Sequence, residues 1–301
     1  MLVLVQGSTP ASIIGPMQPR HLAILGVGLL GGSIGLAVRS RLKGCKVAGY
    51  GHRAAALDVA LQMGAIDERY EDPAQAVRGA DFVILCTPVG RLASLLAEIA
   101  PVLSPGTIVT DVGSTKRAVV EAAEQSLPPG VHFVGSHPMA GSEKRGVEFA
   151  RADLFDRAVC ITTPTPHTDP QALTNVESFW QTLGMRTTRL DPVEHDRLLA
   201  DVSHLPHAVA GALVAMQDDA ALGLCGKGFL DMTRIAGGDP GLWRDILLEN
   251  RQNVRASLKR LEGHLNELDG LLEHGTPDQL EAWLRGAAER REGLLLRRAD
   301  S

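Results

Sequence analysis

The chain has 301 residues, enough for two domains of ordinary size. Hydrophobic residues make up 45% and charged residues 22%, as expected of a soluble globular protein. The net charge of −5 leaves no excess of basic residues to bind nucleic acid, and we find no apolar run long enough to span a bilayer. These numbers favour neither a nucleic-acid nor a membrane partner.

Two features bear on the cellular compartment. Residues 1–19 contain Pro10 and Pro16 and carry no basic segment ahead of their apolar residues, so we expect a tail and not a signal peptide. The cysteines lie far apart and form no paired motif, which predicts reduced thiols in a cytoplasmic protein and gives no support to a metal site. They are Cys45, Cys86, Cys160 and Cys225.

The first predicted element is a buried strand over residues 21–25, followed by the turn GVGLLGGS (26–33) and a helix over 34–42. This is a GxGxxG motif between a strand and a helix. The first glycine permits a tight turn, the second lets the backbone approach a pyrophosphate, and the third allows close helix–strand packing. A glycine-rich turn without a ligand is the alternative. We predict that a dinucleotide binds at Gly26, Gly28, Leu29, Leu30 and Gly31.

A second strand, residues 46–50, ends in Gly51, His52 and Arg53. A unit of this kind that prefers NAD usually carries an acidic residue here, which binds the ribose 2′-hydroxyl. Gly51 removes that carboxylate, and Arg53 is able to pair with a 2′-phosphate. The pattern indicates NAD(P) and favours NADP, with His52 and Arg53 in the cofactor site. In the alternative, Arg53 stacks on the adenine or lies in solvent.

The alternation continues with helices over 57–63, 73–78, 92–102 and 117–125, and strands over 81–86, 107–110 and 131–134. Such alternation predicts a parallel sheet with right-handed crossovers. The carboxyl ends of these strands share one edge, where ligands bind. Three groups follow strand ends and should meet there: Cys86-Thr87-Pro88, assigned to the cofactor, Ser114, and His137.

His137 stands among small residues in the heptapeptide GSHPMAG (135–141). An imidazole at that edge exchanges protons near neutral pH, because its unperturbed pKa is about 6.5. A structural histidine that caps a turn is the alternative.

Further strands are predicted over 159–162 and 186–190, around a helix over 172–182. Asp191 and Pro192 then form a helix start, after which the pattern is almost wholly helical. We therefore predict an α/β protein: a tail (1–19), a Rossmann-type parallel-sheet domain (20–190) and an all-α domain for substrate binding and dimerisation (191–301).

One helix of the second half carries apolar residues at alternating intervals of four and three, the seam of a coiled-coil-like helix. Either this helix packs within its own chain, or it joins two helical domains in a dimer, which we favour slightly. The seam consists of Val254, Leu258, Leu261, Leu265, Leu268 and Leu272.

Two polar clusters lie in the helical half. SHLPH (203–207) places His204 and His207 around a proline, and residues 231–243 hold Arg234 and Trp243 among apolar and small residues. An arginine in such surroundings usually has an anionic partner, because burying it unpaired is costly. That partner is either an internal aspartate or a substrate carboxylate, and both histidines are equally compatible with a structural role.

These motifs occur in one order: GVGLLGGS, DVGSTK (111–116), GSHPMAG, SHLPH and TRIA (233–236). In this the chain resembles the prephenate/arogenate dehydrogenase family of tyrosine biosynthesis over nearly all residues after the tail. The two histidine motifs are specific, whereas the glycine motif alone is not.

The resemblance implies NAD(P)-dependent oxidative decarboxylation of prephenate to 4-hydroxyphenylpyruvate. An arogenate or dual-specificity cyclohexadienyl dehydrogenase, which makes tyrosine, is the alternative. It also implies that His137 accepts the proton of the ring hydroxyl and that Ser114 holds this hydroxyl or His137 in register. Arg234 would bind a substrate carboxylate, and a homodimer would form through the helical domain. The pocket would further include His207, His204, Trp243 and Glu143.

The sequence departs from the family pattern at two points, and two other functions compete with this interpretation. Gly51 replaces the acidic residue of many NAD-using members, and the chain leaves no room for a fused mutase or regulatory domain, so any control by tyrosine is expected at the active site. Dehydrogenases of the β-hydroxyacid type use a catalytic lysine, which the heptapeptide around His137 disfavours. A dinucleotide sensor without turnover is disfavoured by the joint presence of His137, Ser114 and Arg234.

Overall fold

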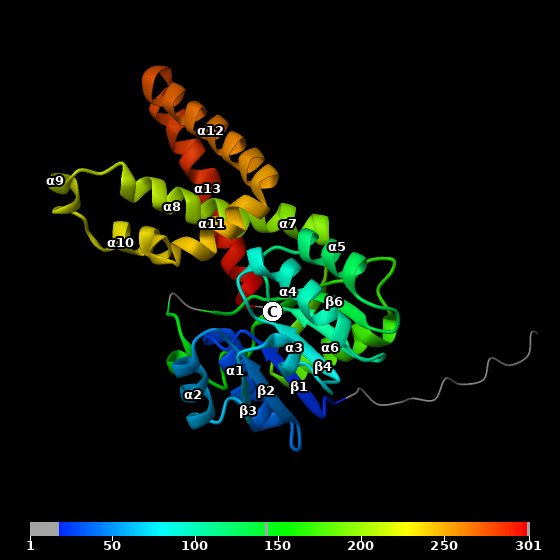
Figure 1. The fold of residues 1–301 in the computed structure, drawn as a ribbon. Coiled ribbons are helices and arrows are strands. Elements are labelled where there is room, and N and C mark those ends of the chain that lie inside the picture. The colour runs from blue at the N-terminus through cyan, green and yellow to red at the C-terminus, as the bar shows by residue number, and fades with distance from the viewer. Residues whose placement is uncertain (1–17, 142–143, 300–301) are drawn as a thin grey trace, which may run out of the picture.

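The computed structural model of the chain describes residues 18–141 and 144–299. A sheet with helices on both faces forms the first part, and helices alone form the second (Figure 1). This arrangement agrees with the predicted fold class.

The sheet has the strand order β3-β2-β1-β4-β5-β6-β7-β8. All neighbouring strands run parallel except β6 and β7, which are antiparallel. The strands are β1 (His21–Leu25), β2 (Lys46–Tyr50), β3 (Glu68–Tyr70), β4 (Phe82–Leu85), β5 (Ile108–Asp111), β6 (His132–Pro138), β7 (Val159–Thr163) and β8 (Arg186–Arg189).

The predicted parallel sheet is confirmed except between β6 and β7, where the pairing is antiparallel. A parallel pair needs a long crossover, usually helical. In the described residues between these strands there is only a 3-10 turn, η3 (Val147–Phe149), and the chain returns in the opposite direction. The short edge strand β3 was also missed, because its sequence, ERY, has no apolar run.

The core lies in two layers, one on each face of the sheet. Along β1, Leu22 and Ile24 belong to one apolar cluster, whereas Ala23 and Leu25 belong to the other, because successive side chains of a strand point to opposite faces. Helices α1 (Leu29–Arg41), α2 (Ala54–Gln62) and α6 (Pro170–Thr182) supply the first cluster; α3 (Pro73–Ala76), α4 (Leu92–Ile99) and α5 (Arg117–Ser126) supply the second.

The helix predicted over 92–102 ends as an α-helix at Ile99 and continues as a 3-10 turn, η2 (Ala100–Val102). Pro101 explains the change, because it has no backbone N–H to donate. A second such turn, η1 (Val89–Arg91), precedes α4.

The second part begins with one continuous helix, made of α7 (Pro192–Leu199), a π-helical turn η4 (Ala200–His204) and α8 (Leu205–Ala215). As predicted, it starts at Asp191, whose side chain accepts hydrogen bonds from the backbone N–H groups of Val193 and Glu194. Pro206 has no N–H for the carbonyl four residues earlier, and the π-helical turn precedes it directly.

Helices α8, α9, α10 and α12 extend away from the sheet (Figure 1), whereas α11 packs against η1 and places Ile246 in the second apolar cluster. Helices α8 and α10 form an arm with α9 at its tip, and α12 and α13 form a long antiparallel pair. Their bounds are α9 (Asp219–Leu222), α10 (Lys227–Thr233), the 3-10 turn η5 (Arg234–Gly237), α11 (Pro240–Glu249), α12 (Arg251–His274) and α13 (Pro277–Ala299).

The continuous helix Pro192–Ala215 has 24 residues and a mean hydropathy of 1.3 over its most apolar window. By length and composition alone it is able to cross a membrane, so the expectation that no stretch is long enough was wrong for this helix. One such helix is weak evidence, because core helices of proteins outside membranes meet the same criterion. Here His195, Asp196 and His204 are all buried.

The predicted apolar seam lies on α12. Val254 is buried, but Leu258, Leu265 and Leu272 are 41%, 55% and 66% exposed. Leu261 and Leu268 are partly buried, and α12 contacts α13, so the seam packs only in part inside its own chain.

Candidate functional site

The glycine turn between β1 and α1 has the geometry that its sequence predicts. Gly26 has φ +117°, and a Cβ there would lie 2.7 Å from the carbonyl carbon of Cys86. A Cβ on Gly31 would lie 2.2 Å from the carbonyl oxygen of Gly26, so only glycine lets α1 approach the strand. At Gly28 nothing lies within 4 Å of such a Cβ, which leaves this backbone open to a ligand.

A cleft of about 220 Å³ opens beside this turn. The hydroxyl of Thr87, buried in its wall, has no hydrogen-bond partner among the described residues, and no side chain caps the start of α1. Free N–H groups at a helix start attract phosphate, so these residues fit a dinucleotide. Gly26, Gly28, His52, Arg53, Cys86, Thr87 and Pro88 line the cleft, whereas Leu29, Leu30 and Gly31 form the first turn of α1.

The far end of the cleft lies after β2. The His52 ring packs edge-on against Tyr50 with 5.3 Å between ring centroids, and its Nε2 lies 3.2 Å from the Tyr50 hydroxyl. Arg53 is exposed and forms no ion pair within the described part of the chain. This end therefore offers one free cation and no carboxylate in the cleft wall.

A buried ion pair joins the carboxyl ends of β5 and β6. Asp111 and Lys116 are both fully buried and in direct contact. The Asp111 carboxylate accepts from the backbone N–H of Ser136 at 3.0 Å, and Lys116 Nζ donates to the Ser136 carbonyl at 2.9 Å. The pair therefore fixes the backbone immediately before His137.

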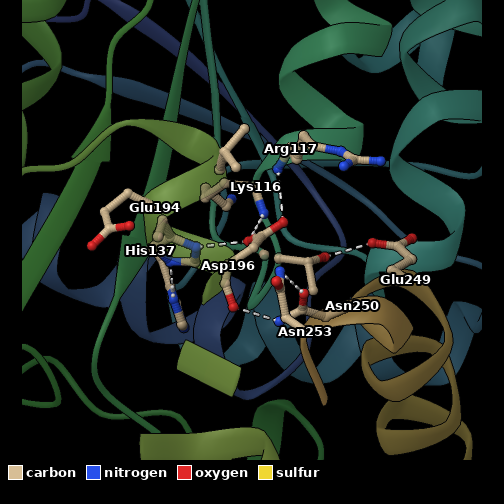
Figure 2. Close-up of polar contacts among 12 residues, drawn as sticks. Lys116, Arg117, His137, Glu194, Asp196, Glu249, Asn250 and Asn253 are labelled. Carbon is tan, nitrogen blue, oxygen red and sulfur yellow. Dashed lines mark hydrogen bonds and ion pairs between the residues drawn. The ribbon is translucent and has the colours of Figure 1, made fainter. Parts of the chain in front are cut away.

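His137, 8% exposed, is held by a second histidine. Its Nδ1 lies 3.0 Å from Nε2 of His195, and Nδ1 of His195 lies 2.8 Å from Oδ1 of Asp196. Asp196 also accepts from the backbone N–H groups of Lys116 at 2.8 Å and Arg117 at 3.1 Å, as Figure 2 shows. The start of α5 and the histidine pair thus share one carboxylate.

The electrostatic environment keeps these imidazoles neutral. Burial, then the neighbouring His195, Lys116 and His204, hold the pKa of His137 well below its usual value. Burial also lowers the pKa of His195, although its hydrogen bond to Asp196 acts in the opposite direction. A neutral imidazole keeps a lone pair on one ring nitrogen, so His137 has the chemistry of a proton acceptor.

Burial raises the pKa of Asp196, but hydrogen bonds from His195 and from the backbone of Lys116 and Arg117 outweigh it, and the net pKa lies below its usual value. Asp196 is thus a carboxylate at neutral pH.

His204 and Trp243 extend the site into the helical part. Asn250 Nδ2 lies 3.0 Å from Nδ1 of His204 and donates to the Asp196 carbonyl at 2.7 Å. This contact assigns the proton of His204 to Nε2. Burial lowers the pKa of His204 to about 4. Its ring centroid lies 6.3 Å from that of Trp243, which stacks on His207 at 3.5 Å.

For the other predicted substrate residues in the described part of the chain, the structure shows a position but no side-chain hydrogen bond to His137. Ser114 is half-buried in the loop between β5 and α5, where its backbone faces His204. Arg234 begins η5, beside α8, and is exposed. Within the same segment, a Cβ on Gly238 would lie 2.5 Å from Trp243. Glu143 lies outside the described residues.

Sequence reasoning missed the residues that hold the site together. The motif around DVGSTK was recognised, but no role was given to Asp111 or Lys116. His195 and Asp196 follow the predicted helix start at Asp191 by one turn, and this spacing was the available signal. No sequence signal pointed to Asn250, because a residue between two helices, at the end of α11 and before α12, is expected to have only a capping role.

Alanine substitutions distinguish the two glycine roles. We expect Gly28→Ala to fold normally and to bind dinucleotide about 10-fold or more weakly, because its Cβ enters the open backbone face. Gly31→Ala should lower the unfolding midpoint, because its Cβ meets backbone atoms. Dinucleotide titration and thermal unfolding measure both, and equal binding by Gly28→Ala and the parent chain would contradict this assignment.

The buried histidines predict acid sensitivity. A neutral buried histidine binds its proton less readily in the folded than in the unfolded chain, so stability falls as the pH drops from 6.5 towards 4. We expect the free energy of unfolding, measured with urea, to decrease over this range. His204→Gln should show a shallower decrease, and an unchanged slope would count against the neutral, buried His204.

Comparison with known proteins identifies the family to which the two parts of the chain are similar. Residues 34–189 match the family described as prephenate dehydrogenase, nucleotide-binding domain, and residues 191–286 match prephenate dehydrogenase, dimerization domain. The chain is 36% identical over 286 residues to a prephenate dehydrogenase of Bacillus subtilis, covering 92% of this chain and 76% of that protein. It is 34% identical to a cyclohexadienyl dehydrogenase of Zymomonas mobilis, covering 85% and 92%.

Among solved structures, the fold is similar to prephenate dehydrogenase from A. aeolicus in complex with hydroxyphenyl propionate and NAD+. The TM-score is 0.87 at 34% identity, with 93% of this chain and 100% of that chain covered. With both halves matched in order and relatives of this identity over most of their length, the chain belongs to the prephenate dehydrogenase family of oxidoreductases.

Proposed function

We propose that the chain catalyses the NAD(P)-dependent oxidative decarboxylation of prephenate to 4-hydroxyphenylpyruvate, with His137 as the proton acceptor. The observation that carries this proposal is the neutral imidazole of His137 at the end of β6, on the same sheet edge as the glycine turn. Membership of the family supports the reaction class.

In this reaction the carbon that bears the ring hydroxyl loses a hydride, the ring loses CO2, and the product becomes aromatic. A bound nicotinamide supplies the hydride acceptor. His137 takes the hydroxyl proton on Nε2, since its Nδ1 contacts His195. General-base assistance of this kind is worth about 10²–10⁴-fold in rate. Ser114 holds the hydroxyl in register, as the family resemblance implies.

The substrate lies between the two parts of the chain. His204 is fully buried at this junction, between the backbone of Ser114 and the ring of Trp243. His207 and Trp243 form a stacked wall of the pocket. Arg234 binds a substrate carboxylate with its bidentate guanidinium. Glu143 is assigned to entry of the substrate.

The second candidate substrate is arogenate, in place of or beside prephenate. A relative named cyclohexadienyl dehydrogenase favours retaining it. The two substrates differ only in an oxo acid against an amino acid on the side chain.

We assign residues 20–190 to cofactor binding and 191–301 to substrate binding and dimerisation. A homodimer is supported by the family description of residues 191–286 and by exposed apolar side chains on the arm and on α12. On the arm these are Met216, Leu224, Leu230 and Met232, and on α12 they are Leu258, Leu265 and Leu272. The free state of all four cysteines is compatible with a cytoplasmic location.

The activity is tested by following nicotinamide reduction with prephenate or arogenate, each combined with NAD or NADP. We expect turnover with at least one pair. His137→Asn should reduce kcat by about 10²–10⁴-fold while dinucleotide still binds, because the amide cannot accept the proton.

His132→Asn, a substitution on the same strand but at its opposite end, is the matched control and should retain activity. Absence of turnover with every pair, in folded protein that binds dinucleotide, would reject the dehydrogenase and favour a sensor.

Cofactor preference is tested at Arg53. We expect NADP to be preferred, because the cleft presents this cation and no carboxylate. Arg53→Gln should raise the KM for NADP about 10-fold and leave that for NAD nearly unchanged, since only the 2′-phosphate contact is lost. Equal effects on both cofactors would mean that Arg53 contacts the adenine or solvent instead.

A further inference from the structure

The contact between His137 and His195 does more than orient a ring. We propose, on the basis of the function proposed above, that His137 and His195 act as one proton acceptor. As Nε2 of His137 takes the substrate proton, the proton on its Nδ1 passes to Nε2 of His195. The positive charge then rests on His195, against Asp196.

The hydrogen bonds between His137, His195 and Asp196 fix which ring nitrogen carries each proton. Ionised Asp196 is an acceptor only, so Nδ1 of His195 carries a hydrogen. In the neutral ring Nε2 of His195 then has a lone pair, and this atom lies 3.0 Å from Nδ1 of His137. Nδ1 of His137 must therefore be the donor, and its Nε2 keeps the lone pair.

The surroundings decide where the charge is more stable. His137 faces the buried cation Lys116 and lies near His204, and none of the described carboxylates bonds to it. His195 also feels Lys116, but it contacts Asp196 directly and lies near Asp111. A buried cation without a partner is costly, and pairing it with a hydrogen-bonded carboxylate offsets much of that cost.

Asp196 remains a carboxylate throughout. Its two oxygens accept from the backbone N–H groups of Lys116 and Arg117 at the start of α5 as well as from His195. The positive end of that helix favours negative charge. Asp196 also lines a pocket of about 410 Å³ together with Thr115, Glu249 and Asn250, where water can solvate it.

The transfer balances. The substrate O–H bond breaks as Nε2–H forms on His137, and Nδ1–H of His137 breaks as Nε2–H forms on His195. No electrons are transferred in this sequence, because the hydride leaves the substrate carbon separately. Two protons move for each turnover, and His195 acts through His137 without touching substrate.

The first experiment uses His195→Gln. The amide oxygen can accept the Nδ1–H of His137, so the ring stays oriented, but an amide cannot take the proton. We expect kcat to fall about 10-fold or more, with KM nearly unchanged. In mixtures of H2O and D2O, the rate of the parent enzyme should vary with deuterium content along a curve, which indicates two protons in motion, and that of the variant along a straight line.

Glu194→Gln is the matched control, because Glu194 precedes His195 on the helix and pairs with Arg197 at the surface. The Glu194→Gln enzyme should keep the kcat of the parent enzyme, and its rate should still vary with deuterium content along a curve. A His195→Gln enzyme with parent kcat and a curve would overturn the relay and leave His195 a merely orienting residue.

Asp196→Asn tests the counter-charge, and the groups that face the pair are Asp111, Lys116 and His204. The loss of negative charge should lower the pKa of the pair, so the acid limb of the kcat profile moves to lower pH. An acid limb of the kcat profile at the same pH as in the parent enzyme would contradict the proposal that the positive charge lies on His195. Asn keeps an acceptor oxygen for the start of α5, so the fold should be retained.

The last measurement needs no activity. Nitrogen-15 NMR of the parent chain with labelled histidine, assigned with His195→Gln, should show that His195 gains its proton at higher pH than His137. The reverse order would reject the proposal. If the parent enzyme turns over no substrate, the proposed function fails, but this titration still decides whether the pair places its charge on His195.

Discussion

The buried ion pair between Asp111 and Lys116 is the constraint on which the site depends. It ties the loop after β5 to the backbone of Ser136, so it sets both the start of α5 and the position of His137. Removing one partner would leave an unpaired buried charge, which costs several kcal/mol, typically about 3–5. The lysine is therefore structural here, although lysine is the catalytic group in the rival dehydrogenases considered from the sequence.

A second carboxylate connects the two parts of the chain. Asp196 comes from the helical part and binds the start of α5 in the sheet part, while Asn250 joins its carbonyl to His204 (Figure 2). Thr115 and Glu249, 2.5 Å apart, add a further contact across the same junction. The orientation of the His137, His195 and His204 rings is thus inseparable from docking of the helical part on the sheet.

Much of this was predictable because the sheet obeys local rules. Apolar runs gave β1 and β4, and the glycine spacing gave the turn in which Gly26 adopts φ +117°. The partners of His137 were not predictable. His195 lies 58 residues further along the chain, and its pairing depends on how one helix docks, which no local pattern encodes. The antiparallel β6–β7 pair differs, because a local signal was available: no helical pattern separates the two strands, and a parallel pair needs such a crossover.

The π-helical turn Ala200–His204 gives the long helix a second function. His204 follows His195 by nine positions, and in an unbroken α-helix that spacing corresponds to roughly 900° of rotation, which places two side chains on opposite faces. The wider turn rotates less per residue, and both rings are fully buried and face the same carboxylate-bearing junction. One helix therefore brings two buried histidines to the same junction, and an insertion or deletion of a single residue between them would turn one ring away.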